Sequence, residues 1–169
     1  DLLGRDSVMP NKKLLKVNIQ KKVILITGAG GSIGSELCRQ AMLLGPKKII
    51  LYEHSESALY EIEQELNQIN LHKIEVVPVI GSVIDKQRMK KIFNQFGVQT
   101  IYHAAAYKHV PLVEFNQSQG ILNNIIGTRM LAEASIACNI EIVVLISTDK
   151  AVKPTNIMGA SKRVAELIL

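Results

Sequence analysis

Residues 22–34, KVILITGAGGSIG, decide the fold of this chain. Residues 23–26 form a short apolar, mostly β-branched run, which is typical of a strand buried on both faces of a sheet. The run leads directly into a glycine-rich segment, and a helical pattern follows. Glycines let the backbone turn sharply and approach a phosphate, and a helix N-terminus offers free N–H groups and a positive dipole end. The stretch therefore predicts a strand, an anion-binding turn and a helix.

The glycines of this turn have a spacing that favours a dinucleotide. Gly28, Gly31 and Gly34 follow a G-x-x-G-x-x-G pattern, and a G-x-x-x-x-G-K nucleotide loop is excluded because Ser35 follows Gly34. An accidental tight turn could have the same spacing, but the flanking strand and helix supply the context that the motif needs. We therefore assign these three glycines, Ser32 and Ile33 to cofactor binding.

Composition points to a single α/β domain. The chain has 169 residues, of which 47% are apolar and 4% aromatic, which is unlike a disordered chain or a small disulfide scaffold. Cys38 and Cys138 lie in helical patterns, which favours buried thiols in a reducing compartment. No apolar run approaches the roughly 20 residues that cross a bilayer, and no signal peptide is visible.

The net charge of +5 could suggest nucleic acid, but the lysines scatter and lack stacking aromatics. A solvated basic surface, or a basic segment near anionic lipid, is favoured over a nucleic-acid groove.

The order of predicted elements indicates a doubly wound parallel sheet with right-handed crossovers, the Rossmann architecture. Residues 1–20 are predicted to be a linker or an arm on the outside of the domain, and residues 21–169 an incomplete dinucleotide-binding domain. The final helical pattern continues to the last residue without a cap signal, which we interpret as a fragment of a longer protein. Strands are expected at residues 22–27, 48–52, 74–80, 100–103 and 141–147, and helices at 33–44, 55–70, from Asp85, at 118–138 and from Asn156 onward.

Two features beyond the turn are compatible with a bound dinucleotide. Glu53 ends the second strand, where a carboxylate can accept hydrogen bonds from an adenosine ribose and repel a 2′-phosphate. It favours NAD over NADP, although His54 and Ser55 beside it keep NADP open, and a plain surface glutamate is the alternative. Residues 104–106 (Ala104, Ala105, Ala106) follow the fourth strand, where small side chains let a flat cofactor lie close to the backbone; simple tight packing explains them equally well.

The segment with the most chemistry is residues 147–162, STDKAVKPTNIMGASK. Hydroxyl groups end the fifth strand there, and Asp149 and Lys150 place an acid and a base at the same sheet edge. An isolated Asp-Lys pair is otherwise a surface ion pair of little energetic value. Met158 and Lys162 are four residues apart and share one face of the last helix. In the HAAAYKHVP segment, His103 is expected to make structural hydrogen bonds and Lys108 and His109 to contact substrate; the two histidines do not have a metal-binding spacing, and no metal is expected.

Four motifs together resemble the extended short-chain dehydrogenase/reductases, and most closely the CapD-like nucleotide-sugar 4,6-dehydratases of bacterial polysaccharide biosynthesis. They are TGAGGSIGSELCRQ, HAAAYKHVP, NNIIGT at residues 123–128, and STDKAVKPTNIMGASKRVAE, and the resemblance extends from LLGR at residues 2–5 to the last residue. It implies a lyase reaction on a UDP-N-acetyl-hexosamine: NAD takes a hydride from C4, water leaves across C5 and C6, and the hydride returns to C6. The product is a 4-keto-6-deoxy sugar.

The resemblance also implies roles for individual residues. Thr148 should hydrogen-bond the C4 hydroxyl, Asp149 should protonate the departing C6 hydroxyl, Lys150 should remove the C5 proton, and Lys162 should hold the nicotinamide ribose. Met158 stands where the superfamily has the tyrosine that acts as base, and a thioether cannot accept that proton. The C4 base therefore stays open between Asp149, Lys150 and an ordered water.

Other assignments follow from the same resemblance. Ser82 stands where an aspartate commonly meets the adenine, and we assign it and Val83 to the cofactor and Asn124 to the substrate. Members that share the methionine and the LLGR segment are membrane-anchored. We therefore expect the full-length protein to be a homo-oligomer on the cytoplasmic side of the bacterial inner membrane, anchored by a region before this chain, with a sugar-binding region after it. The fragment itself is expected to be soluble.

The leading hypothesis is the cofactor-binding part of a UDP-N-acetylglucosamine 4,6-dehydratase, which binds NAD but has little activity alone. A C4 epimerase shares the oxidation step but does not need the Asp149–Lys150 pair. A non-catalytic dinucleotide-binding module that reports redox state suits the missing tyrosine. It does not explain why Thr148, Asp149, Lys150 and Lys162 are present together.

Overall fold

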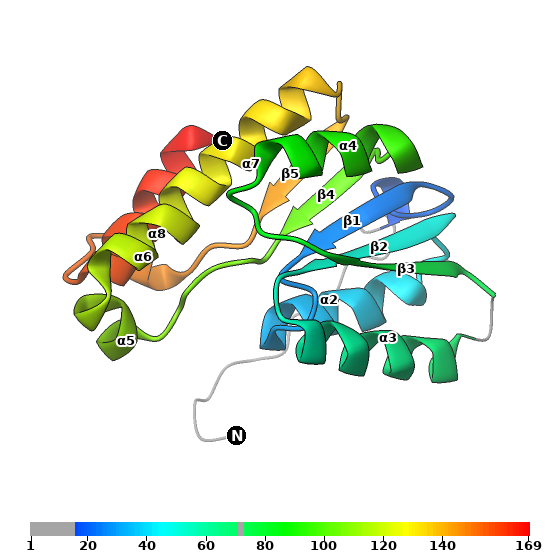
Figure 1. The fold of residues 1–169 in the computed structure, drawn as a ribbon, viewed down its shortest axis with the longest axis horizontal. Helices are drawn as coiled ribbons and strands as arrows, with labels where there is room; N and C mark the ends of the chain where they lie inside the picture. The colour runs from blue at the N-terminus through cyan, green and yellow to red at the C-terminus, as the bar shows by residue number, and fades with distance from the viewer. Residues whose placement is uncertain (1–15, 71–72) are drawn as a thin grey trace.

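The computed structural model describes residues 16–70 and 73–169, and their fold is shown in Figure 1. One five-stranded sheet has the order β3-β2-β1-β4-β5, and every pair of neighbouring strands is parallel. This confirms the doubly wound sheet predicted from the alternation of strands and helices. The strands are β1 (Val23–Thr27), β2 (Lys48–Glu53), β3 (Glu75–Ile80), β4 (Thr100–His103) and β5 (Ile142–Leu145).

Helices cover both faces of the sheet (Figure 1). Helices α2 (Ser32–Met42) and α3 (Glu56–Ile69) lie on one face. Helices α4 (Lys86–Phe96) and α7 (Gly127–Ala137) lie on the other, and α8 (Ile157–Ile168) packs beside α7. Two short helices, α5 (Val110–Phe115) and α6 (Gln117–Ile121), pack against α8.

The central strand β1 contributes side chains to the hydrophobic cores on both faces of the sheet. All five residues of β1 are buried. Because successive side chains of a strand point to opposite faces, Ile24 and Ile26 join the α2–α3 core while Val23 and Leu25 join the α4–α7 core. The apolar run that opens the fold is thus buried on both faces, as predicted.

The strand order reverses beside β1. After β3 the chain crosses to β4 on the opposite side of β1, so the carboxyl ends of β1 and β4 flank a crevice. The two ends are joined there, because the N–H of Ala104 donates to the carbonyl of Thr27 at 3.2 Å. The glycine turn after β1 and the loop after β4 therefore lie next to each other.

Helix starts were predicted well where a cap marks them. Asp85 accepts a hydrogen bond from the N–H of Arg88 at 2.9 Å, and α4 begins at the next residue. Ser55 caps α3 through the N–H of Ala58. Ile69, the last residue of α3, is 46% exposed although it continues the apolar spacing of the buried Leu59, Ile62 and Leu66.

The prediction of one helix over residues 118–138 was wrong in detail. The segment is α6, then a π-helical turn η1 (Leu122–Ile126), then α7. Helix α5 was not predicted, and β5 is shorter than the expected strand. The apolar spacing continues through all three parts, so periodicity alone could not reveal the π turn.

Residues 1–15 of the predicted arm lie outside the described residues. Farther along the arm, Ile19 is buried in the α2–α3 core, and the N–H of Lys21 donates to the carbonyl of Gly45 at 2.9 Å. Cys38 is buried and Cys138 is half-buried, and both are free thiols. Among the helices of residues 16–70 and 73–169, none combines the length and the hydrophobicity that a bilayer crossing requires.

Candidate functional site

Three neighbouring cavities lie along the carboxyl edge of the sheet, and nearly all predicted site residues line them. The Glu53 cavity, of about 50 Å³, lies at the end of β2. The Lys162 cavity, of about 270 Å³, lies between the glycine turn and the end of β5. The His109 cavity, of about 570 Å³, lies beside the loop after β4 and helix α5. The second and third cavities share Gly31, Ser32, Ala106 and Lys108, and the first and third share Tyr107.

Gly28 and Gly34 of the turn are packed too tightly to hold a side chain. Gly28 has φ +64°, and a Cβ on Gly34 would lie 1.9 Å from the Gly28 carbonyl oxygen. Gly31 precedes α2, and no side chain of the described residues caps this helix. Since Ser32, Ile33 and Gly34 line the Lys162 cavity, the free N–H groups of the first turn adjoin it. A glycine cradle at an uncapped helix N-terminus is a suitable site for a phosphate.

Glu53 joins the end of β2 to this turn. Its side chain is buried, and Oε2 accepts from the N–H of Gly30 at 3.1 Å. Oε1 accepts from the N–H groups of His54 and Ser55 at 2.8 and 3.0 Å and lies 2.8 Å from His54 Nδ1. Because each carboxylate oxygen has two lone pairs, Oε2 can accept one further hydrogen bond. Glu53 lines the Glu53 cavity, so this acceptor belongs to the cavity wall.

Helix α8 brings Met158 and Lys162 to the Lys162 cavity, one turn apart as predicted. Lys162 is 7% exposed, and its ammonium group donates to the carbonyl of Ile146 at 2.6 Å, just after β5. Burial lowers the pKa of Lys162. Met158 is buried in the wall of the same cavity.

The segment after β5 holds Lys150 in a fixed turn. Thr148 caps the 3₁₀ turn η2 (Asp149–Ala151), and its hydroxyl donates to Asp149 Oδ1 at 3.0 Å. Ala151 is fully buried, and a Cβ on Gly159 of α8 would lie 2.4 Å from the Lys150 carbonyl oxygen, so η2 packs tightly on α8. Thr148 and Lys150 line the Lys162 cavity, whereas Asp149 is exposed and does not.

The other predicted site residues are distributed over the three cavities. Lys108 reaches across to α2, where its ammonium group donates to Ser32 Oγ at 3.1 Å. His109 lines the largest cavity. The cofactor assignments at Ala104 and Ala106 fall on the Lys162 cavity, and those at Gly28, Ser82, Val83 and Ala105 on the Glu53 cavity.

Asn124 was assigned to the substrate, but it lines none of the three cavities and is only 1% exposed. Its Oδ1 accepts from the N–H of Tyr107 at 2.8 Å and from Asn123 Nδ2 at 3.2 Å. Its Nδ2 donates to the Tyr107 carbonyl at 3.0 Å and to Ser161 Oγ at 2.9 Å. With every donor and acceptor used, Asn124 clamps the loop after β4 to the π turn and to α8.

His103 confirms the prediction of structural hydrogen bonds. Thr128 Oγ1 donates to the Asn124 carbonyl at 2.7 Å, so it must accept from His103 Nε2–H at 3.0 Å. His103 Nδ1 then accepts from the Thr27 hydroxyl at 2.7 Å. Burial, reinforced by the positive charge of Lys162, lowers the pKa of His103 to about 3, so the ring stays neutral. The strand that carries the glycine turn is thereby tied to α7.

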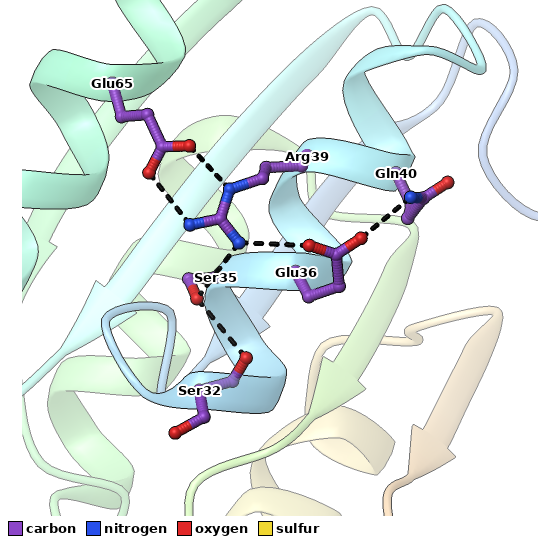
Figure 2. A network of polar contacts seen from close by, with 6 residues as sticks. All are labelled: Ser32, Ser35, Glu36, Arg39, Gln40 and Glu65. Carbon is purple, nitrogen blue, oxygen red and sulfur yellow. Dashed lines mark hydrogen bonds and ion pairs between the residues drawn. The ribbon is translucent and has the colours of Figure 1, made fainter. Parts of the chain in front are cut away.

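A polar network fixes α2 against α3 (Figure 2). Arg39 binds both carboxylate oxygens of Glu65, at 2.5 and 2.9 Å, and also binds Glu36 at 3.0 Å. The bond to Arg39 lowers the pKa of Glu65. Ser35 Oγ extends the network to the first turn of the helix, where it donates to the Ser32 carbonyl at 3.3 Å. The network therefore joins the first half of α2 to α3.

Sequence reasoning missed several residues that line the cavities. Tyr107 borders two cavities, yet nothing in its spacing distinguishes it from a surface tyrosine. Two residues of the His109 cavity wall, Leu112 and Val113, belong to α5, which is too short for periodicity to reveal. The missed residues of that wall are Tyr107, Leu112, Val113, Asn116 and Gln119.

Replacing Asn124 by alanine should lower the free energy of unfolding by about 2–3 kcal/mol, because its buried amide makes four hydrogen bonds, two of them with the backbone of Tyr107, that alanine cannot make. Asn123→Ala is the matched control: Asn123 is half-buried, and its amide donates only to Asn124 in this network. We expect a change below roughly 1 kcal/mol for it. Urea unfolding of both variants measures the difference, and equal losses would show that Asn124 is not the clamp.

Comparisons with known proteins agree with this geometry. The family model described as "Polysaccharide biosynthesis protein" matches residues 24–169. The capsular polysaccharide biosynthesis protein CapD of Staphylococcus aureus is 50% identical over 169 residues, which cover 100% of this chain and 28% of CapD. A UDP-N-acetylglucosamine 4,6-dehydratase (inverting) of Campylobacter jejuni is 35% identical over 143 residues, covering 84% of this chain and 41% of the relative.

Two further similarities bear on the reaction and on the fold. A UDP-glucose 4-epimerase of Rickettsia rickettsii is 33% identical over 149 residues, covering 86% of this chain and 42% of the epimerase. The X-ray structure of Pen from Bacillus thuringiensis superposes with a TM-score of 0.81 at 29% identity, covering 89% of this chain and 44% of Pen. The chain thus spans less than half the length of each of these relatives.

Proposed function

The chain belongs to the polysaccharide biosynthesis protein family, and from that membership we propose that it is the NAD-binding part of a UDP-N-acetylglucosamine 4,6-dehydratase. The full-length protein is then a sugar-nucleotide-modifying lyase that makes a 4-keto-6-deoxy sugar for a surface polysaccharide or glycan. Within the chain, residues 21–169 are the dinucleotide-binding domain, and residues 1–20 are an arm whose Ile19 packs into the α2–α3 core.

The observation that carries this proposal is the arrangement of three features along one sheet edge. The Glu53 carboxylate, the glycine cradle at α2 and the buried Lys162 follow one another there, suited to a ribose, a pyrophosphate and a second ribose in turn. Among the described residues that line the Glu53 cavity, none is a lysine or an arginine. A 2′-phosphate would therefore meet a carboxylate without a strong cation, which favours NAD over NADP.

The proposed chemistry uses the residues after β5. NAD bound at this edge would take a hydride from C4 of the hexose and later return it to C6. The resulting C4 carbonyl makes the C5 proton acidic. Lys150 would remove that proton, and the electron pair would form the C5–C6 double bond as Asp149 protonates the C6 hydroxyl, which leaves as water. When the hydride returns to C6, the protonated Lys150 would return a proton to C5, which completes the 4-keto-6-deoxy sugar. Thr148 hydrogen-bonds the C4 oxygen and Lys162 the nicotinamide ribose, while the C4 base is Asp149, Lys150 or an ordered water because Met158 cannot accept a proton.

An epimerase is the second candidate, and the Rickettsia relative supports it. Epimerisation returns the hydride to the other face of C4 and leaves the C5 proton in place. Lys150, which η2 fixes in the wall of the Lys162 cavity, has no role in epimerisation. Its presence therefore favours dehydration. A non-catalytic redox-sensing module is the third candidate, and it leaves this lysine unexplained as well.

Incubating the full-length protein with NAD and UDP-N-acetylglucosamine, and following the sugar by NMR, tests the proposal. We expect a 4-keto-6-deoxy product. The C4 epimer as sole product would make the protein an epimerase, and NAD binding without sugar chemistry would make it a sensing module. The 169-residue chain alone should bind NAD with little or no turnover, and rapid product formation by it would contradict a need for the sugar-binding region.

We also infer the setting of the full-length protein. Its resemblance to membrane-anchored dehydratases supports a homo-oligomer at the cytoplasmic side of the bacterial inner membrane. Its substrate is then a cytoplasmic UDP-sugar, and its anchor is a region outside the 169 residues.

A further inference from the structure

We propose that Tyr52 is a positioning residue for the adenine end of the dinucleotide, because its ring and hydroxyl hold the backbone of residues 81–83 in place. This segment, named here the base wall, consists of Gly81, Ser82 and Val83 and closes one side of the Glu53 cavity. The inference rests on the proposed function, since it presupposes a dinucleotide whose ribose lies at Glu53.

Tyr52 supports the base wall from beneath through its ring and its hydroxyl. The residue is 1% exposed in β2, directly before Glu53. Its hydroxyl donates to the Ser82 carbonyl at 3.0 Å. Gly81 lies against the ring so closely that a Cβ there would be 2.4 Å from both Cζ and Oη. The backbone of the wall therefore rests directly on the tyrosine.

The hydroxyl of Tyr52 is available only as a structural donor. Burial, with the nearby charge of Asp85, raises its pKa to about 12, so it keeps its proton at neutral pH. The Ser82 carbonyl accepts a second bond, from the N–H of Asp85 at 3.0 Å. These two donors fix the central residue of the wall from β2 and from the start of α4.

Helix α7 limits the wall from the other side. Val83 is 4% exposed, and a Cβ on Gly127 would lie 2.7 Å from Val83 Cγ2. Arg88 Nε also donates to the Ile80 carbonyl at 2.7 Å, just before the wall begins. The base wall is thus held between Tyr52 and α7.

This arrangement couples the wall to the ribose site. Tyr52 and Glu53 are adjacent in the chain, so one strand end carries both the support of the base wall and the carboxylate proposed to bind the ribose. A phenylalanine would fill the same space but would release the Ser82 carbonyl from β2. The wall could then move relative to Glu53 while the core under it stays packed.

Titrations of Tyr52→Phe with three ligands test the role. AMP and NAD both carry adenosine, whereas nicotinamide mononucleotide does not, and NMR titration tolerates weak binding. We expect AMP and NAD to bind about three- to tenfold more weakly, the range for losing one hydrogen bond, and nicotinamide mononucleotide to bind unchanged. A general structural effect would not separate the ligands in this way.

Two further variants make the test specific. Tyr102→Phe is the matched control, since Tyr102 is a half-buried tyrosine of the neighbouring strand β4 that lines none of the three cavities; it should bind all three ligands normally. Gly127→Ala pushes on Val83 from α7 and should reproduce the pattern of Tyr52→Phe. Wild-type affinity of Tyr52→Phe for AMP, or an equal loss for nicotinamide mononucleotide, would overturn the positioning role alone. A wild-type protein that binds neither AMP nor NAD would overturn the proposed function together with it.

Discussion

Replacing Gly34 by alanine should weaken NAD binding at least about 100-fold and lower the free energy of unfolding by about 3 kcal/mol. The added Cβ would lie 1.9 Å from the Gly28 carbonyl oxygen and 2.7 Å from its carbonyl carbon. Both contacts are with backbone, so no side chain can rotate away to relieve them. Gly28 is itself constrained, because a Cβ there would lie 2.7 Å from Ala105 Cα in the loop after β4. The turn can accommodate the methyl group only by opening, and the phosphate cradle is then lost.

Gly31→Ala is the matched control in the same turn. Its φ of −73° suits any residue, and its Cβ would meet only the Gly28 carbonyl oxygen, at 3.2 Å. We expect its free energy of unfolding to change by less than roughly 1 kcal/mol and its NAD affinity to fall less than about tenfold. Calorimetric titration with NAD and urea unfolding measure both quantities. Wild-type NAD binding by Gly34→Ala would show that this turn does not hold the cofactor.

The sequence predicts the layers of this fold because their signals are local. The buried run of β1 identifies a central strand, and Asp85 and Ser55 mark helix starts through bonds to N–H groups three residues ahead. Each of these signals depends on neighbouring residues only. The sheet order then follows from the alternation of strands and helices.

The features that were missed depend on contacts between distant segments. Asn124 appears in the sequence as a polar residue in a helical pattern, but Tyr107 and Ser161, which it binds, lie 17 and 37 residues away. Asn124 makes these bonds from within the π turn η1. The same dependence explains why the assignment of Asn124 to substrate could not anticipate its burial.

The lining of the Lys162 cavity was predicted more completely than that of the His109 cavity. Strand ends and glycines place the Glu53 and Lys162 cavities, since the carboxyl edge of a parallel sheet brings them together. The His109 cavity instead depends on α5, whose packing against α8 is fixed by Glu114, which accepts from the N–H of Ile157 at 2.6 Å. No local pattern indicates that bond.

Replacing Lys150 by alanine in the full-length protein should reduce formation of the 4-keto-6-deoxy sugar by roughly 10²- to 10⁴-fold, the usual contribution of a general base. The backbone of Lys150 is fixed between the buried Ala151 and Gly159 of α8, so truncating its exposed side chain removes the amine without disturbing η2. NAD affinity should stay within about threefold of the wild type. The loss would then belong to the sugar chemistry and not to cofactor binding.

Running the reaction in D₂O makes this test specific for C5. A base that removes the C5 proton allows solvent deuterium to enter at that carbon, so the wild type should give a labelled product and Lys150→Ala should give almost none. Lys153→Ala is the matched control, because Lys153 is an exposed lysine three residues along that lines none of the three cavities, and it should behave as the wild type. If Lys150→Ala forms labelled product at the normal rate, the C5 proton is removed by another group. If the wild type interconverts C4 epimers without taking up deuterium, the lysine has no C5 proton to remove and the enzyme is an epimerase.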